Sequence, residues 1–532
     1  MASDKPKRKR AIRMGFMSTD RHQSDLFGYS LNDFVPKDAK CRFVVDIVSD
    51  LNLTELYSRY SSQGNDAFDP SMMLSTWFYA YSNAVTTTRK LEQRCQRDLH
   101  YMFVSGNLKP DHTSLSRFRK NHLDLIPDYF LQIIRIAIEK GISDFKLISI
   151  DGSKIQAASS IKHSKTSDEL SQYLDKVRKD IQDYMHHCDL FDENSADESN
   201  VEQIRSKIND LKKLEKTLLD RQEELEKRKS SLKAEHRKKH KINIAEPEAR
   251  NMNKVNGRQK LPAYNVQLSV DAKTQLIAAN QTVTLSNDYD QLSVQHKNVE
   301  TNLGPDSQRC YVYDAGYHNL EHLEYINLNH INAYVASPRK DSAEYPGNFN
   351  RIDFVYDAEH DYYKCPAGNK LTYENDYNKQ DKWSGRVYKT QACPSCRLKE
   401  QCLAQNKKSK YRRIRREHRE IYAEHMQKKG RTDHAKYLQH IRSTTVEPAF
   451  GNLKANLGFR RFSLKGHIQV SGEFNLMCIA HNLNKLFKLT GKTKHDKKIS
   501  VDYLKTSCQR TMIQFFEKLY LIFNPFSRIR II

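Results

Sequence analysis

The amino-acid sequence predicts a mixed α/β (α+β) protein with more than one domain. Its 532 residues are too many for one ordinary compact core. Apolar residues recur at helical spacing through about the first 140 positions, and short β-rich runs alternate with helical stretches after that. The 28 Tyr and 22 Phe residues supply large core side chains, which excludes a wholly disordered chain.

The charge balance indicates a polyanionic partner. The 88 Lys and Arg residues outnumber the 65 Asp and Glu residues, which leaves a formal net charge of +23. Nucleic acid is the leading candidate, because phosphate neutralisation dominates such binding; a basic protein without such a partner is the alternative. No apolar stretch is long enough for a bilayer, and the basic N-terminus MASDKPKRKRAIR lacks a secretory apolar run. We therefore expect a cytoplasmic protein with no membrane partner.

The N-terminal part is predicted to be helical. We expect a basic disordered arm over 1–24 and a helical DNA-binding domain over 25–141. The stretch PDHTSLSRFRKNH combines helix-capping residues with Arg117, Arg119 and Lys120, as a compact DNA-binding unit would. A helical domain that only packs against its neighbour is the alternative.

A charged helical stretch follows the first β-rich run and is predicted to form a helical hairpin over 164–242. One row of apolar residues repeats every seven positions, whereas the companion row turns polar, so an extended dimeric coiled coil is less favoured. The repeating residues are Ile204, Leu211, Leu218, Leu225 and Leu232. The partner helix carries Leu170, Leu174, Val177 and Ile181.

Three acidic residues are candidates for catalysis. Asp151 and Asp314 each follow a short β-rich run and precede a small residue, as active-site residues at the ends of strands do. Glu447 is expected at a helix start, because Thr444 and Glu447 fit a capping box and Pro448 fits a first turn. The alternative is turn chemistry for the aspartates and capping alone for Glu447. Asp271, in a predicted hairpin turn, is a rival aspartate with a predicted structural role.

These segments together resemble the DDE transposases of bacterial insertion sequences, in the branch with a Y-R-E-K signature. The resemblance is carried by IDGSKIQA, EPEARNM, YNVQLSVDAKTQLIAA, VYDAGY and TVEPAFGNLK, and it extends from about residue 25 to about residue 487. The glutamate-to-lysine spacing of the signature holds for Glu447 and Lys454. Arg442 is separated from Glu447 by four residues instead of three, Gln439 stands at the tyrosine position, and Tyr437 is displaced by two.

The resemblance implies a ribonuclease H-like catalytic core over 142–337 and 430–490, with an insertion over 338–429 and a C-terminal helical tail over 491–532. The first core strand would end at Asp151 and the fourth at Asp314, and the last helix would carry Glu447. These three carboxylates would hold Mg²⁺ (or Mn²⁺) for phosphodiester chemistry. Lys454 and Arg442 would contact DNA phosphate.

A cysteine group within the insertion predicts a structural Zn²⁺ site. Cys365, the C-x2-C pair Cys393 and Cys396, and Cys402 supply four thiols in one segment. Four reduced structural thiols are the alternative. The basic run that follows is a candidate for DNA contact, against the alternative of a solvated face. Its candidate residues are Lys407, Lys408, Arg412, Arg413, Arg415 and Arg416.

The resulting hypothesis is a DNA transposase that binds terminal inverted repeats and performs Mg²⁺-dependent cleavage and strand transfer. Double-stranded DNA is its expected partner, and a homo-oligomer is expected because two element ends must be held together. The alternatives are a catalytically inactive DNA-binding protein descended from a transposase, and a ribonuclease H-like nuclease that does not join ends.

Overall fold

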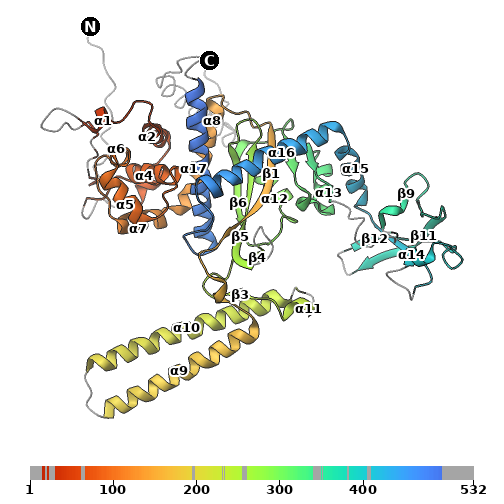
Figure 1. Ribbon diagram of the computed structural model, residues 1–532, viewed down its shortest axis with the longest axis horizontal. Coiled ribbons are helices and arrows are strands. Elements are labelled where there is room, and N and C mark those ends of the chain that lie inside the picture. The colour runs from red at the N-terminus through yellow and green to blue at the C-terminus, as the bar shows by residue number, and fades with distance from the viewer. Residues whose placement is uncertain are drawn as a thin grey trace, which may run out of the picture.

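The computed structural model describes residues 15–17, 19, 21–22, 30–60, 66–193, 198–230, 232, 234–253, 260–338, 349, 351–379, 383–403 and 409–493. The described part is a mixed α/β structure, as predicted (Figure 1). N-terminal helices lie on one side of a central sheet, and a small β-rich unit lies on the other (Figure 1). Most of the predicted basic arm and nearly all of the predicted C-terminal tail lie outside the described residues.

The N-terminal helices surround α4, which is buried along nearly its whole length. The Asp69 carboxylate caps α4 by accepting the N–H of Met72, and Pro70 occupies the first turn. The elements are α1 (Leu31–Phe34), α2 (Lys40–Asp50), α3 (Thr54–Ser58), α4 (Pro70–Ser82), α5 (Thr88–Arg97), α6 (Leu99–Val104), α7 (His112–Asn121), the 3-10 turn η1 (Leu123–Leu125) and α8 (Ile126–Glu139).

The central sheet has the strand order β4-β5-β1-β7-β8, and β6 pairs with β5. The β1, β4, β5 and β6 pairings are antiparallel, whereas β7 and β8 run parallel to β1. The strands are β1 (Leu147–Gln156), β4 (Arg250–Asn253), β5 (Lys260–Asp271), β6 (Ile277–Val283), β7 (Cys310–Tyr313) and β8 (Ala333–Val335). The helical elements between them are α12 (Leu292–Leu303), η3 (Ala315–Tyr317) and α13 (Leu320–Leu328).

The turn between β5 and β6 contains the rival aspartate, Asp271. Its buried carboxylate accepts hydrogen bonds from Thr274 N, Thr274 Oγ1 and Ser143 Oγ. These bonds fix the hairpin turn, and the structural role predicted for Asp271 is the one that its contacts support.

The expectation that the first core strand ends at Asp151 is wrong. β1 continues to Gln156, and its pairing with the long strand β5 runs from Ile148↔Asp271 to Gln156↔Ala263. The parallel pairing with β7 does stop at Ile150↔Tyr313. Asp151 therefore lies in the middle of β1, where this strand is still paired with β5 but no longer with β7.

The expectation that Glu447 begins a helix is also wrong. Glu447 lies late in α16 (Asp433–Gly451), which is capped by Thr432 and contains Pro448 in its interior. The buried stripe of α16 packs across β1, β5 and β7, and this packing outweighs the local signals of a capping box and a proline. The helix continues as a π-helical turn, η5 (Asn452–Asn456), and is preceded by α15 (Glu420–Gly430).

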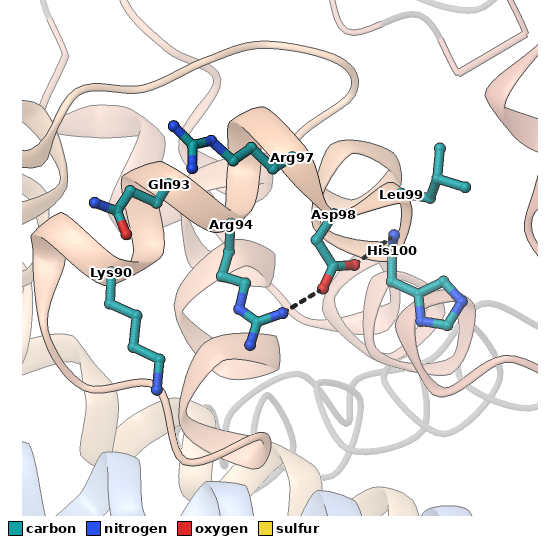
Figure 2. Close-up of a pocket in the computed structure, with 7 residues that line it drawn as sticks. All are labelled: Lys90, Gln93, Arg94, Arg97, Asp98, Leu99 and His100. Atoms are coloured by element: carbon teal, nitrogen blue, oxygen red, sulfur yellow. Dashed lines mark hydrogen bonds and ion pairs between the residues drawn. The ribbon is translucent and has the colours of Figure 1, made fainter.

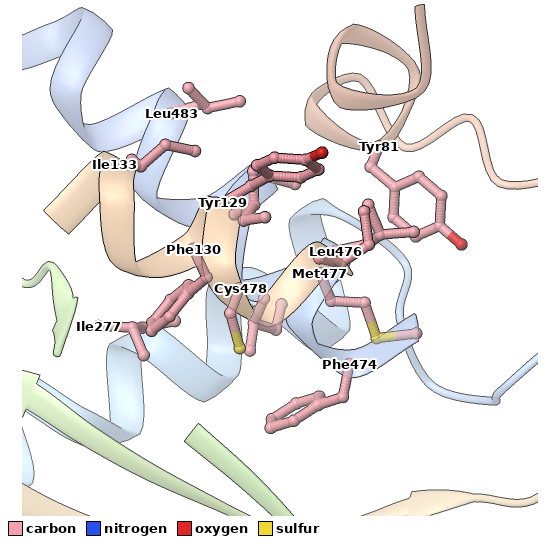
Figure 3. Close-up of a cluster of buried hydrophobic side chains, with 14 of the residues drawn as sticks. Tyr81, Tyr129, Phe130, Ile133, Ile277, Phe474, Leu476, Met477, Cys478 and Leu483 are labelled. Atoms are coloured by element: carbon pink, nitrogen blue, oxygen red, sulfur yellow. The ribbon is translucent and has the colours of Figure 1, made fainter. Parts of the chain in front are cut away.

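The last helix, α17 (His467–Thr493), joins the N-terminal helices to the sheet. It packs against α4 and α8 on one side and against β6 on the other. Figure 3 shows Phe474, Met477 and Cys478 of this helix among Phe130 of α8 and Ile277 of β6. One continuous hydrophobic cluster therefore includes the N-terminal helices, the sheet and α17.

Two long helices, α9 (Ser167–Glu193) and α10 (Glu198–Ser230), run side by side away from the sheet (Figure 1). They share a separate cluster of buried side chains, formed by Leu170, Leu174, Val177, Ile181, Leu218, Leu225 and Ile242. The elements at their base are η2 (Ile161–His163), the paired strands β2 (Ser164–Lys165) and β3 (Ile242–Asn243), and α11 (Ala234–Arg237).

The β-rich unit is an antiparallel sheet with the order β13-β12-β11-β10-β9 and its own small core. Its elements are η4 (Arg351–Asp353), β9 (Val355–Asp357), β10 (Tyr362–Lys364), β11 (Lys370–Lys379), β12 (Trp383–Lys389), α14 (Lys399–Leu403) and β13 (Arg413–Glu417). Across the described ranges, no helix combines the length and the hydrophobicity needed to cross a bilayer.

Candidate active site

Two aspartates lie side by side where β1 and β7 meet. The two strands are parallel and in register up to Ile150↔Tyr313, so Asp151 and Asp314 occupy the next position along each strand. Side chains at one register position of a parallel pair point to the same face of a sheet. Both carboxylates therefore face α16, which crosses these strands.

Arg442 of α16 joins the two aspartates. Its Nη1 donates to Asp151 Oδ2 at 2.9 Å, and its Nη2 lies 3.5 Å from Asp314 Oδ1. The side chains of Arg442, Asp151 and Asp314 are 10%, 20% and 46% exposed, respectively. One largely buried guanidinium thus offsets the repulsion between two carboxylates, although Arg442 departs from the spacing of the family signature.

The electrostatic environment of Asp151 favours a nearby cation. Burial raises the pKa of Asp151 to about 6, and the negative charges of Asp314 and Asp288 contribute to the increase. Arg442 and the N–H of Gly152, which donates to Asp151 Oδ1 at 2.7 Å, act in the opposite direction. A cation strongly stabilises the ionised form of a carboxylate that is poorly solvated and close to other negative charges.

Glu447 lies on the same helix as Arg442 but is not brought to the aspartates. Five positions along an α-helix correspond to a rotation of about 140°, so the orientation that directs Arg442 to the sheet turns Glu447 away. The Glu447 side chain is exposed, and no hydrogen bond or ion pair links it to another described residue.

The two candidates for the signature tyrosine, Tyr437 and Gln439, face different surroundings. Tyr437 is 58% exposed on α16. Gln439 instead reaches the sheet, where its Nε2 donates to the carbonyl of Tyr313 at 3.2 Å, next to Asp314. Gln439 therefore fastens α16 to the end of β7, a position for which Tyr437 is not oriented.

Lys454 reaches the site from the π-helical turn that follows α16. Its Nζ donates to Ser153 Oγ, two residues beyond Asp151 on the same face of β1. Burial lowers the pKa of Lys454, and the charge of Asp151 acts against this decrease. Arg442 and Lys454 thus both approach β1 near Asp151, Arg442 at Asp151 itself and Lys454 at Ser153.

A further carboxylate, Asp288, supports the site and was missed in the sequence. Its Oδ1 accepts hydrogen bonds from Asn265 Nδ2 at 2.8 Å and from Gln267 Nε2 at 2.5 Å. A Cβ atom at Gly152 would lie 2.2 Å from this oxygen, so only glycine fits beside it. Asp288 lies in a loop whose sequence, SNDYDQ, reads as an ordinary turn, and no local pattern distinguishes it.

The aspartate pair suits a hard divalent cation. Mg²⁺ and Mn²⁺ prefer carboxylate oxygens, and Mg²⁺ often keeps several waters and takes only one or two protein carboxylates. Asp151 and Asp314 meet this requirement. In the part of the chain that the structure describes, no three Asp, Glu, His or Cys side chains are grouped closely enough to hold a metal ion as they lie.

The four candidate zinc ligands share one location in the β-rich unit. Cys365, Cys393, Cys396 and Cys402 all border a cavity of about 20 Å³. Two tight turns present three of them, and Cys402 lies in α14. In the turns, Gly368 N–H donates to the carbonyl of Cys365 at 2.8 Å, and Cys396 N–H donates to that of Cys393 at 3.3 Å. Burial raises the pKa of Cys402 to about 11. The donor set fits Zn²⁺, although the thiols are not drawn together at ligand distances.

The basic run contributes several arginines that have partners inside the β-rich unit. Arg413 pairs with Glu374, and Arg416 Nη1 donates to Tyr363 Oη at 3.4 Å. Arg412 Nη1 donates to the carbonyl of Cys402 at 3.3 Å, and Arg415 lies 4.4 Å from the ring centroid of Tyr377. These side chains therefore stabilise the unit itself. The predicted DNA contacts Lys407 and Lys408 lie outside the described residues.

Two segments of the chain match known protein families. Residues 364–487, which include Glu447 and Lys454, match the family described as Transposase DDE domain. Residues 29–121 match the family described as Transposase domain (DUF772). Among curated proteins, none matches the chain significantly. A DDE domain implies a ribonuclease H-like fold, and the two domains support a transposase function of the polynucleotidyl-transferase type. Both matches support a DDE transposase of a bacterial insertion sequence.

Proposed function

We propose that this transposase binds the terminal inverted repeats of its own insertion sequence and catalyses Mg²⁺-dependent DNA cleavage and strand transfer. The observation that carries the proposal is the pair Asp151 and Asp314, held by Arg442 at adjacent positions of two parallel strands. A pair of neighbouring carboxylates at the end of a parallel pairing is where phosphoryl-transfer chemistry can bind its cation.

Asp151 and Asp314 are the residues we assign to Mg²⁺ or Mn²⁺, with Glu447 as the third carboxylate. When bound, the ions would activate the attacking oxygen and stabilise the leaving oxygen of an in-line displacement at phosphorus. Glu447 lies on α16, the helix that contacts both aspartates through Arg442, but its side chain faces away from them, so it would join the ions only after α16 reorients.

Arg442 and Lys454 are the residues we assign to the DNA phosphates at the reacting end. Both lie beside Asp151, and a planar guanidinium binds a phosphate in bidentate fashion, whereas an ammonium acts as a point charge. In the protein without DNA, the same two cations neutralise the carboxylates. Arg442 would exchange its carboxylate partners, and Lys454 its hydroxyl partner Ser153, for phosphate as the site fills.

The remaining parts receive supporting roles. We assign a structural Zn²⁺ to the four cysteines, because all four border one cavity. We assign the paired helices α9 and α10 as an insertion in the catalytic core, and the basic strand β13 with its preceding segment as a DNA contact. The enzyme would act as a homo-oligomer on DNA in the cytoplasm, since one reaction must join two element ends.

The test uses labelled duplex DNA from the ends of the element, with Mg²⁺. The full chain should nick and join this DNA, and Asp151→Asn should abolish both steps while binding persists. Asp433→Asn is the matched control, because that aspartate is 98% exposed on α16. Binding without nicking by the unaltered chain would indicate an inactive descendant, and nicking without joining would indicate a nuclease. Glu447→Gln tests the third carboxylate separately.

A further inference from the structure

The outer face of α5 is the most polar and basic helix face in the N-terminal region. We define the α5 face by its exposed residues, which are Arg89, Lys90, Gln93, Arg94, Gln96 and Arg97. The opposite side of the helix is anchored by Leu91 and Cys95, both 0% exposed. The backbone of α5 is thus held by the domain while its outer side chains are left to solvent.

An open hollow of about 740 Å³ lies along this face at the junction of α5 and α6. Lys90, Gln93, Arg94 and Arg97 border it, and they leave the helix as extended side chains (Figure 2). The junction itself is fixed by Asp98, which pairs with Arg94 at 3.0 Å and accepts the N–H of His100 at 3.1 Å. The hollow is therefore bordered by hydrogen-bond donors, and the helix that carries them is anchored in the domain by buried side chains.

α5 packs mainly against other N-terminal helices. It contacts α6 and α7, whereas α4, α8, η1 and α2 carry the contacts of the N-terminal region with α17. A long ligand could therefore lie along α5 without displacing any of the elements that hold the domain to the sheet.

The basic residues that the sequence emphasised, on α7, are arranged differently. Arg119 is buried, where its Nη1 donates to Tyr81 Oη and to the carbonyl of Thr86, each at 3.0 Å. Its guanidinium lies 4.6 Å from the ring centroid of Trp77. Arg119 therefore stabilises the helical core, and of the three basic residues named in the sequence only Arg117 and Lys120 are exposed.

The chemistry of the α5 face matches the major groove of duplex DNA. Arg side chains bind guanine and Gln side chains bind adenine through paired hydrogen bonds, while Lys contacts phosphates. The ten residues of α5 extend about 15 Å, and a groove about 12 Å wide admits such a helix. An acidic protein surface would match the charge but would not account for the glutamines between the arginines.

We propose that the α5 face reads the sequence of the terminal repeats from the major groove, with Gln93, Arg94 and Arg97 as the residues that contact bases. The inference rests on the proposed function, because it assigns the end recognition that transposition requires to one helix. The fixed junction at Asp98 would set the angle at which α5 enters the groove.

The test compares binding of the full chain to a labelled duplex from an element end and to a scrambled duplex of equal length. In the variant Gln93→Ala/Arg94→Ala/Arg97→Ala, we expect the preference for the end duplex to fall at least about tenfold, since one lost base contact is typically worth about 5- to 150-fold. The control Arg117→Ala/Lys120→Ala removes the same charge from α7 and should keep the preference. Thermal unfolding of both variants checks that the domain remains folded.

A second variant separates base reading from charge. Arg94→Lys/Arg97→Lys keeps both charges but loses the bidentate donors, so binding to the scrambled duplex should persist while the end preference falls. Equal losses in the α5 variant and the α7 control, or an unchanged preference in the α5 variant, would overturn the inference and leave the proposed function in place. A wild-type chain that does not prefer element ends would overturn both.

Discussion

Gly152 lies at the crowded point behind the aspartate pair. Asp151 directs its carboxylate toward α16, and the following residue faces the other side of the sheet, where Asp288 and Gln267 approach the strand. The glycine that follows the first aspartate is therefore required by close approach and not by turn formation, because β1 continues through this position.

Replacing Gly152 by alanine should destabilise the protein and displace Asp151. The new Cβ would lie 2.2 Å from Asp288 Oδ1 and 2.5 Å from Gln267 Nε2. We expect the free energy of unfolding to fall by about 1–3 kcal/mol, as for other overpacked sites, and DNA cleavage to fall with it. Urea denaturation and the end-cleavage assay measure the two effects.

Gly430→Ala is the matched control for this substitution. Apart from its chain neighbours and the backbone of its own helix, no described atom lies within 4 Å of a Cβ at that position. Its free energy of unfolding should therefore change by no more than about 0.5 kcal/mol. If Gly152→Ala behaved like this control, the contact between Asp288 and β1 would not be as close as the structure has it.

His481 should make the fold sensitive to acid. It is fully buried, with Nε2 2.8 Å from the carbonyl of Gln275 and Nδ1 3.0 Å from Asn452 Nδ2, so the neutral ring donates from one nitrogen and accepts at the other. Burial lowers the pKa of His481 to about 4. The unfolded chain takes up this proton below about pH 6.5, whereas the folded chain does so only near pH 4.

Unfolding should therefore become easier as the pH falls through this window. Between pH 7.5 and pH 5.5, we expect His481 to contribute a loss of about 1 kcal/mol in the free energy of unfolding. His481→Gln can keep both hydrogen bonds without a titrating group, and its stability should fall less over the same interval. Parallel urea titrations at the two pH values make the comparison. An identical pH dependence in both proteins would contradict the assignment.

At the scale of elements, the sequence predicts the features that depend on the periodicity of apolar residues and on the ends of β-rich runs. The apolar positions of 170–181 and of Leu218 and Leu225 bury one another between α9 and α10. Asp314 directly follows β7, as its context predicts. These features depend on local pattern, so one sequence is enough to find them.

The sequence is misleading where tertiary packing overrides a local signal. Pro448 reads as a helix start, yet the buried face of α16 carries the helix through it. The turn that aims Lys454 at Ser153 is π-helical, a geometry without a residue code. Asp288 approaches β1 only through the β5 side chains Asn265 and Gln267, and such long-range contacts have no counterpart in local pattern.

The paired helices α9 and α10 should be removable without loss of the central fold. They have their own cluster of buried residues, and the chain enters and leaves them through the adjacent strands β2 and β3, paired at Ser164↔Asn243 and Lys165↔Ile242. We expect a protein in which 168–240 is replaced by a short Gly-Ser turn to unfold at a similar temperature.

The deletion protein would also carry Ile242→Thr, because the removal exposes that side chain. Near-ultraviolet circular dichroism during heating measures its tertiary packing against that of the full chain. The same replacement of 435–450 in α16 provides the contrasting case, since its buried residues contact the sheet, and it should prevent folding. Loss of a cooperative transition in the first protein would show that the paired helices support the core.

At the scale of the whole molecule, the N-terminal helices and the central sheet share one interior. The hydrophobic cluster runs from Val35 to Leu486. Polar contacts also cross between the parts: Lys40 Nζ donates to Asn484 Oδ1 at 3.0 Å, and Asn484 Nδ2 donates to the carbonyl of Ser82 at 2.9 Å. The surface that we infer to read DNA is thus coupled rigidly, through α17, to the aspartate pair.

This arrangement predicts that α4, α17 and β5 open together. Native-state hydrogen exchange of the full chain should give their slowest amides the same free energy of opening, because exposing any one of them breaks the shared cluster. The β-rich unit has a separate core around Tyr363 and Tyr388, so its amides should exchange through a distinct opening of lower free energy. A metal chelator should accelerate exchange only in that unit if the cysteines hold Zn²⁺. Earlier opening of α4 than of β5 would instead mean that the N-terminal helices are an independent domain, hinged to the catalytic core and not fixed to it.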